Sequence, residues 1–124
     1  MVGCRNQYEG IPDLNIDIYI NTLDPNYQQL SGVGEWAYTN GGSKGIVVFH
    51  HDLNQYVAYD RHCTFDSNNA CSKISADDNS IYATDSCCGS RFQLLDGVPV
   101  QGSATLPLKR YNTSFDGNII HIWN

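Results

Sequence analysis

Four of the five cysteines lie between positions 63 and 88, and no other segment constrains the fold as strongly. They are Cys63, Cys71, Cys87 and Cys88. None of them forms a CxxC pair, the compact spacing typical of many zinc sites and redox motifs. Four cysteines can form two disulfides in three ways, and spacing alone does not choose among them. Each bridge would close a loop of some tens of residues or fewer and contribute about 3 kcal/mol to stability.

The rest of the chain favours a single all-β domain. Its 124 residues are enough to bury a core. Eleven glycines, eight tyrosines and few strong helix formers favour strands over helices. The net charge of -6 makes nucleic acid an unsuitable partner. No apolar run approaches the length needed to cross a bilayer.

The hydrophobic pattern predicts strands on both sides of the cysteine-rich segment. Residues 14–21 alternate apolar and polar side chains over eight positions, which is typical of a half-buried strand. Residues 46–50 are mostly apolar, which indicates a central strand covered on both faces. Further strands are expected at 35–39, 56–60, 72–74, 81–84, 91–94, 108–114 and 119–123. A loop or a short helical turn is expected within 27–34, and turns are expected at 77–79 and 116–117.

The residues after the last cysteine resemble the Rieske iron-sulfur domain. Cys88–Phe92 reads Cys-Gly-Ser-Arg-Phe, and it is followed by an Asp-Gly turn at 96–97, by Gly102 and by the Pro-Leu pair at 107–108. The second cluster loop of the Rieske family reads Cys-x-x-His-Gly-Ser-x-Phe, followed by a strand, a glycine-containing turn, a further glycine and a Pro-Leu pair. The resemblance covers roughly Ile46 to Trp123.

The resemblance implies an antiparallel β sandwich or barrel with a small inserted subdomain that carries the cysteines. On this reading, residues 1–13 are an N-terminal tether. Residues 14–60 and 97–124 form the β scaffold. Residues 61–96 form the cluster-type subdomain.

The family's cluster ligands are changed in this chain. A Rieske cluster needs two thiolates on one iron and two imidazoles on the other. The four positions are occupied here by Cys63, Phe65, Asp85 and Cys88. Phenylalanine cannot bind a metal, and a carboxylate is a hard ligand poorly matched to iron and sulfide. The resemblance therefore implies that the scaffold is kept, that the usual [2Fe-2S] cluster is lost and that these positions hold neither cofactor nor metal.

The resemblance also suggests a disulfide pairing. In many Rieske proteins from oxidising compartments, a disulfide ties the two cluster loops together, and Cys71 and Cys87 match its positions. Cys63 and Cys88 occupy the vacated ligand positions, which face one shared centre in the family. We therefore expect Cys71–Cys87 and Cys63–Cys88 bonds, the second provided that its two Cα atoms lie within about 7 Å.

Three alternatives use the same residues. Cys63, Asp85 and Cys88, with His62, offer ligands that suit a single zinc ion. Cys63, Asp85 and Cys88 would be the ligands of an electron carrier with an atypically bound [2Fe-2S] cluster. The adjacent Cys87 and Cys88 would be the active pair of a thiol-disulfide oxidoreductase, although Asp85 nearby does not favour a thiolate.

The N-terminus predicts the cellular location. Met1–Cys4 is similar to the end of a bacterial lipoprotein signal, in which a small residue precedes the lipidated cysteine. Cys4 is also the cysteine left over when the other four pair. A lipid on Cys4 would attach the protein to a membrane, and disulfides indicate an extracytoplasmic compartment. We expect a non-enzymatic Rieske-fold protein of the bacterial cell envelope, periplasmic or on the outer membrane, with a binding or accessory role; the sequence indicates no ligand or protein partner.

Overall fold

The computed structural model describes residues 10–65, 67–77 and 80–124, and these are nearly all β. The predicted all-β class is confirmed. Cys4, residues 1–9 of the predicted tether and residues 78–79 of the predicted turn lie outside the described residues. The elements are β1 (Asp17–Asn21), the 3-10 helix η1 (Pro25–Ser31), β2 (Trp36–Thr39), β3 (Ile46–Asp52), β4 (Gln55–Asp60), β5 (Ile74–Ala76), β6 (Tyr82–Asp85), β7 (Arg91–Gln93), β8 (Pro99–Gln101), β9 (Arg110–Phe115) and β10 (Ile119–Trp123).

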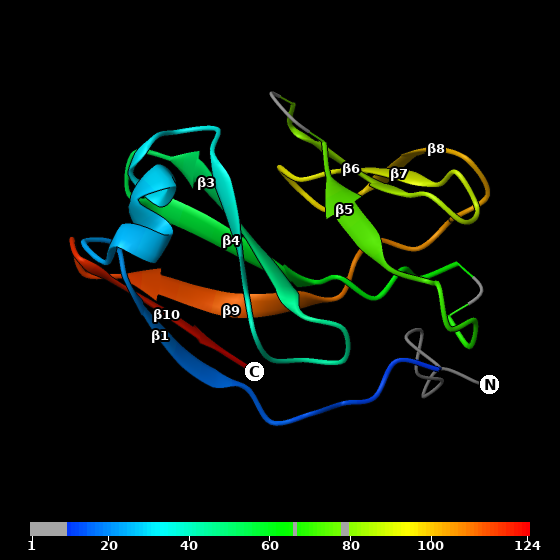
Figure 1. The fold of residues 1–124 in the computed structure, drawn as a ribbon, viewed down its shortest axis with the longest axis horizontal. Coiled ribbons are helices and arrows are strands. Elements are labelled where there is room, and N and C mark those ends of the chain that lie inside the picture. The colour runs from blue at the N-terminus through cyan, green and yellow to red at the C-terminus, as the bar shows by residue number, and fades with distance from the viewer. Residues whose placement is uncertain (1–9, 66, 78–79) are drawn as a thin grey trace, which may run out of the picture.

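Six strands from the two ends of the described chain form the larger sheet (Figure 1). Their order is β1-β10-β9-β4-β3-β2, and every neighbouring pair is antiparallel. The C-terminal strand β10 lies between β1 and β9, as the pairs Asp17–Trp123 and Ile120–Phe115 show. Strands from both segments predicted to form the scaffold, 14–60 and 97–124, therefore lie in this sheet.

The first strand begins later than its alternating pattern predicts. Leu14 is 43% exposed, and the ladder starts at Asp17. The preceding backbone is held instead by the side chain of Asn124, which donates to the Leu14 carbonyl and accepts from the Ile16 amide. A side chain thus replaces the strand ladder over this short stretch.

The central strand β3 is buried on both faces, as its apolar run predicts. Ile46 and Val48 face one core cluster, together with residues of β1, β10 and η1. Val47 and Phe49 face the other cluster, which includes side chains of the small sheet. Because successive strand residues point to opposite faces, one strand contributes to both cores. The second core joins the small sheet to the large one.

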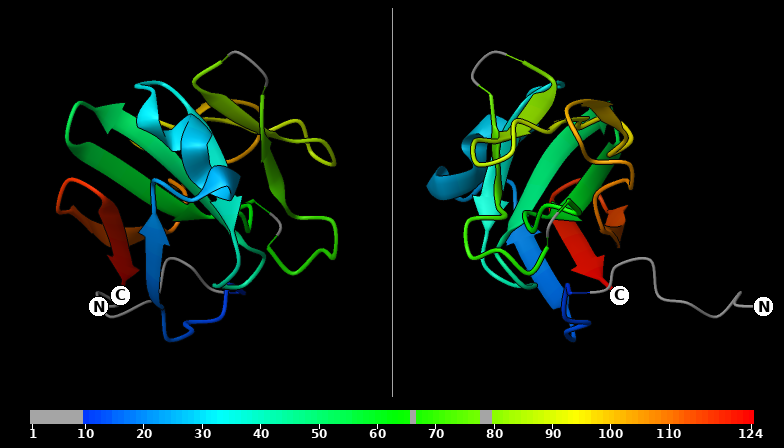
Figure 2. Two further views of the ribbon diagram at one scale, coloured as in Figure 1. Left: turned by 60° about the vertical axis from the view of Figure 1, so that its left-hand side comes forward. Right: turned by 90° about the vertical axis from the view of Figure 1, so that its right-hand side faces the viewer.

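The small sheet has the strand order β5-β6-β7-β8 and lies beside the large sheet (Figures 1 and 2). Its last strand, β8, was not predicted, and it falls within the segment 97–124 assigned to the scaffold. Residues 99–101 therefore belong with the inserted subdomain. Pro99 at the start of a three-residue edge strand gives little period-two signal, which explains the missed strand.

Among the described residues, no helix is long and apolar enough to span a membrane. The one helix in the described part of the chain is η1, which has seven residues. It starts after Asp24, whose side chain accepts from the Asn26 amide. Leu30 is its one buried residue and belongs to the first core cluster.

Candidate functional site

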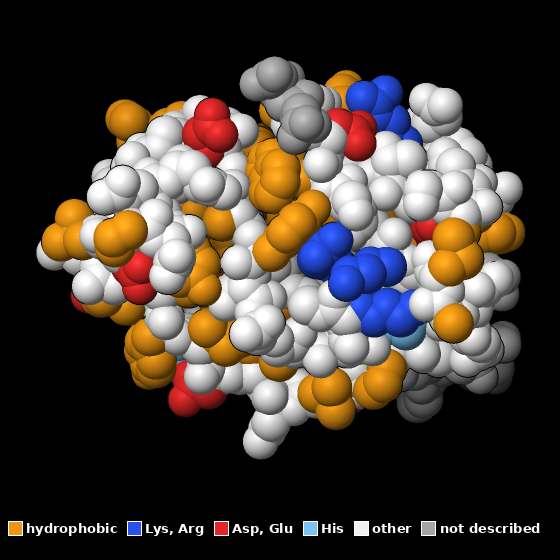
Figure 3. All heavy atoms as spheres, in the orientation of Figure 1, with side chains coloured by type: hydrophobic (Ala, Val, Ile, Leu, Met, Phe, Trp, Pro, Cys, Tyr) orange, Lys and Arg blue, Asp and Glu red, His pale blue; other side chains and the backbone are white. Residues whose placement is uncertain are grey.

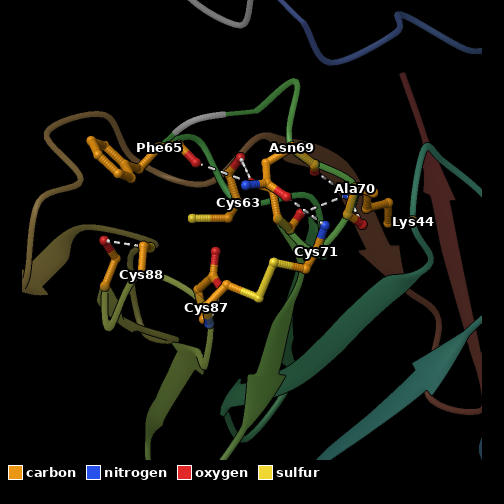
Figure 4. The surroundings of a disulfide bond; sticks show 11 residues. Lys44, Cys63, Phe65, Asn69, Ala70, Cys71, Cys87 and Cys88 are labelled. Carbon is orange, nitrogen blue, oxygen red and sulfur yellow. Dashed lines mark hydrogen bonds between the residues drawn. A yellow bond between two sulfur atoms is a disulfide. The ribbon is translucent and has the colours of Figure 1, made fainter.

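Two loops at one end of the small sheet carry the residues predicted from the sequence (Figure 4). The first loop connects β4 to β5 and contains Cys63, Phe65 and Cys71. The second connects β6 to β7 and contains Cys87 and Cys88. Figure 4 shows that Cys63 and Cys71 of the first loop lie opposite Cys87 and Cys88 of the second. The structure thus brings the predicted site residues of the first loop close to those of the second loop.

The second loop is a tight turn closed by its own backbone. The Asp85 amide donates to the Ser90 carbonyl, and the Gly89 amide donates to the Asp85 carbonyl, each at 2.8 Å. Gly89 has a φ of 78°, a conformation that favours glycine. The carboxylate of Asp85 accepts from the Cys87 amide at 2.8 Å. These bonds fix Asp85 at the start of the turn and Cys88 near its end.

The predicted Cys71–Cys87 disulfide is present. Its Cα atoms lie 6.3 Å apart, within the normal range for a disulfide. The bond ties the first loop to the second, and both cysteines are exposed. Because Cys87 is bonded to Cys71, it does not pair with its neighbour Cys88.

The predicted Cys63–Cys88 disulfide is wrong for this structure, in which both residues are free thiols. Their sulfurs do point into the same space between the loops (Figure 4). Each is engaged with another group, however. The Cys63 side chain is hydrogen-bonded to Asp85, and the Cys88 sulfur lies 3.2 Å from the hydroxyl of Ser90.

Cys63, Asp85 and Cys88 form a compact group of potential metal ligands. One sulfur from each cysteine and one carboxylate oxygen all lie within 4.8 Å of one another. Cys63 and Asp85 are buried, at 0% and 1% exposure, and Cys88 is half-buried. Burial, and then the hydrogen bond and charge of Asp85, raise the pKa of Cys63 to about 12, partly offset by the backbone hydrogen bond from Phe65. The site is therefore closed on the Cys63 side and more open at Cys88.

The ligand set does not fit a Rieske cluster. The residues offer three ligand atoms where such a cluster requires four. The fourth family position is Phe65, which is 38% exposed and has no donor atom. His62 does not replace it, because Nδ1 lies 2.8 Å from the Ser43 hydroxyl and Nε2 lies 2.6 Å from the Ser67 carbonyl. One ring nitrogen contacts the connection between β2 and β3 and the other contacts the first loop, so neither belongs to the group of three ligands.

Buried Asp60 organises the start of the first loop, and sequence reasoning missed it. It is 0% exposed at the end of β4. Its carboxylate accepts from the amides of Ser43, Lys44 and His62 and from the hydroxyl of Tyr111. A carboxylate that accepts several hydrogen bonds can be buried at acceptable cost. The sequence signal was an acidic residue at the end of an otherwise apolar strand.

Lys44 holds the far part of the same loop. Its ammonium donates to the carbonyls of Asn69, Ala70 and Ser72 at 3.1–3.2 Å (Figure 4). Arg61 and Lys73 line the same surface hollow as Lys44, and Figure 3 shows basic side chains gathered on this face. Arg61 is itself fixed, because it donates to the Ile74 carbonyl and lies over the ring of Tyr38. The basic face thus supports the loop.

Gly102 supports the second loop. It has a φ of 88°, and a Cβ added there would lie 2.6 Å from the Cα of Ser90. Ser90 is fully buried and its hydroxyl accepts from the Ala104 amide. The segment after β8 therefore packs directly on the turn that carries Cys88. The glycine predicted from the Rieske resemblance has a physical reason here, which is close backbone approach.

The fold and this pair of loops define the class: the protein has a Rieske-like β fold. The predicted antiparallel β architecture with a cysteine-bearing subdomain is confirmed at this level. The chain is similar to the E. coli protein NirD, known from an NMR structure, with a TM-score of 0.51 and 14% sequence identity. The similarity covers 88% of this chain and 98% of NirD. No family model matches the chain, and no curated protein is significantly similar in sequence.

Proposed function

We propose that this chain is a non-enzymatic Rieske-fold protein that has lost the usual [2Fe-2S] cluster and serves a binding or accessory role. The observation that carries the proposal is the ligand set at the loop tips. Of the four family ligand positions, Phe65 offers no donor atom, Asp85 replaces a thiolate by a carboxylate, and Cys88 replaces an imidazole by a thiol. The three donor atoms of Cys63, Asp85 and Cys88 are one short of what the cluster requires. The two loops nevertheless have a fixed arrangement, because the Cys71–Cys87 disulfide and contacts of Asp60, Lys44 and Gly102 hold them in place.

An extracytoplasmic location is part of this proposal. The support is the Cys71–Cys87 bond, because exposed disulfides persist in oxidising compartments and are reduced in the cytosol. A lipid on Cys4 would anchor the protein to the cell envelope. Fractionation of the native host cells, with mass analysis of the peptide that contains Cys4, tests this part. Soluble cytoplasmic protein with an unmodified Cys4 would contradict it.

The loss of the cluster is tested by chemical analysis of protein produced with ample iron and purified without oxygen. We expect neither acid-labile sulfide nor visible absorption. Two irons and two sulfides per chain, with a reddish-brown colour, would overturn the proposal. The same sample should be incubated with iron and sulfide, because this separates a cluster lost during purification from one that never forms.

Thiol-disulfide exchange is a second candidate function. The observation in its favour is that both members of the Cys71–Cys87 bridge are exposed, next to the free thiol of Cys88. A thiolate at Cys88 would attack one bridge sulfur, form a new intramolecular disulfide and release the other bridge sulfur as a thiolate. That thiolate would attack a substrate disulfide, form a mixed disulfide with the substrate and release one substrate sulfur as a thiolate. This candidate predicts that the protein catalyses insulin reduction by dithiothreitol and that Cys88→Ser abolishes the activity. A bridge that resists mild dithiothreitol in the folded protein would exclude it.

A further inference from the structure

We propose that Cys63, Asp85 and Cys88 bind a single zinc ion, with the fourth position left to water or a small ligand. This inference rests on the proposed function, because a protein that carries a [2Fe-2S] cluster has no place for zinc here. It assigns a metal ion to the site formed by the residues at the former cluster positions.

The chemistry of the three residues suits zinc. Thiolate and carboxylate are both normal zinc ligands, and tetrahedral sites with three protein ligands keep a fourth position open. A softer ion such as Cu(I) would gain little from the carboxylate, and a harder ion such as Mg²⁺ would gain little from the sulfurs. The mixed set therefore favours zinc among the common ions.

The spacing also fits one ion. Two sulfurs bound to a tetrahedral zinc lie about 3.8 Å apart, given bond lengths of about 2.3 Å. The three donor atoms already lie within 4.8 Å of one another without a metal. A contraction of about 1 Å or less would place them around zinc. The first and second loops must approach each other for this, and the Cys71–Cys87 bond already ties them together. The bond therefore limits the conformational cost of metal binding.

Hydrogen bonds around the three residues orient them for this role. The Cys87 amide donates to one oxygen of Asp85. The Cys63 sulfur accepts the backbone hydrogen bond of Phe65, and the Cys88 sulfur lies against the Ser90 hydroxyl. Such outer partners fix the direction of metal ligands and partly compensate the charge of thiolates. The half-buried Cys88 gives the ion a route from solvent.

Binding releases protons. Zinc binds thiolates, so each thiol that ligates it loses its proton to solvent, while Asp85 binds as carboxylate. The ion replaces these protons, and no oxidant or reductant is needed. Zinc binding should therefore also protect Cys63 and Cys88 from alkylation, which gives a readout that does not depend on any activity.

The test is equilibrium dialysis of the Cys4→Ser protein against zinc without oxygen, followed by metal analysis. We expect one zinc per chain. Loss of even a supporting hydrogen-bond partner of a ligand costs about 10–100-fold in affinity, so removal of a ligand should cost more. Cys88→Ser and Asp85→Asn should each weaken binding by more than about 100-fold. Asp96→Asn, at an exposed turn, is the matched control and should bind like the parent.

The outcomes separate the two proposals. No zinc uptake by a folded chain with both thiols free would overturn this inference and leave the loss of the cluster standing. A Cys63–Cys88 disulfide in the purified protein, or zinc binding unaffected by Cys88→Ser, would overturn it as well. Stoichiometric iron and sulfide would overturn the proposed function and the zinc site together. An amide NMR spectrum of each variant shows whether it is folded.

Discussion

Cys63 is a fully buried thiol, and its environment couples its protonation to folding. Burial comes first among the causes that raise its pKa from 9.0 to about 12, and the hydrogen bond and charge of Asp85 come next. The thiol is therefore the favoured form in the folded protein. The pKa values of Tyr59 and Tyr111 are raised as well, also mainly by burial.

The raised pKa of Cys63 predicts a loss of stability at high pH. Between pH 9 and pH 12 the folded protein keeps a proton at Cys63 that the unfolded chain has released, so the free energy of unfolding falls as pH rises through this window. Below pH 9 both states are protonated and this contribution is constant. Urea unfolding at several pH values measures the slope. Cys63→Ala should reduce it, with the remainder due to the tyrosines; an unchanged slope would contradict the assignment.

Asp60 gives a second prediction at this scale. Asp60→Asn removes the charge and part of the accepting capacity from a carboxylate that binds three amides and the Tyr111 hydroxyl. We expect a loss of roughly 2–4 kcal/mol in the free energy of unfolding, because hydrogen bonds to a charged group contribute about 1.5–3 kcal/mol each. Urea denaturation measures this, with exposed Asp96→Asn as the control. Equal stability of the two variants would mean that the Asp60 network contributes little.

At the scale of elements, the two loops depend on a few close contacts between segments far apart in sequence. The disulfide joins the loops to each other. Gly102 joins the second loop to the segment after β8. These contacts hold the candidate site, although none of them supplies a ligand atom.

Removal of the disulfide should lower stability without unfolding the protein. The bond joins residues 16 positions apart, and a loop of that length corresponds to about 3 kcal/mol. The double variant Cys71→Ser with Cys87→Ser should therefore unfold at lower urea concentration. The parent treated with reductant is the matched comparison. If reduction leaves the urea midpoint unchanged, the bond does not stabilise the folded loops.

Alanine substitutions at two glycines distinguish the cost of a steric clash from the cost of backbone strain. Gly102 and Gly117 both have positive φ values, 88° and 107°, so alanine is strained at either position. Only at Gly102 would the new methyl group meet the backbone of Ser90, since nothing lies within 4 Å of the Cβ position at Gly117. Gly102→Ala should cost about 1–3 kcal/mol more than Gly117→Ala. Equal losses in thermal unfolding would contradict the close packing of the second loop.

At the scale of the whole molecule, the sequence predicts the architecture better than the site. The apolar run of β3, the Cys71–Cys87 bond and the return of β10 to the sheet begun by the N-terminal strands all follow the predicted plan. The strand β8 was missed because three residues carry too little pattern. The Cys63–Cys88 bond was wrongly expected, because a shared direction in the family does not say which group each sulfur contacts. The role of Asp60 could not be predicted from the sequence, because it depends on contacts between segments that meet only in the folded chain.

The central claim is that the Rieske-like loops remain and that changed ligands alone exclude the cluster. The most direct measurement is anaerobic reconstitution with iron and sulfide of the parent and of a triple variant, Phe65→His with Asp85→Cys and Cys88→His, which restores the family's two thiolates and two imidazoles. Iron and sulfide analysis and electron paramagnetic resonance of the reduced samples report the cluster. We predict a [2Fe-2S] signal in the triple variant and none in the parent; a cluster in the parent would contradict the account.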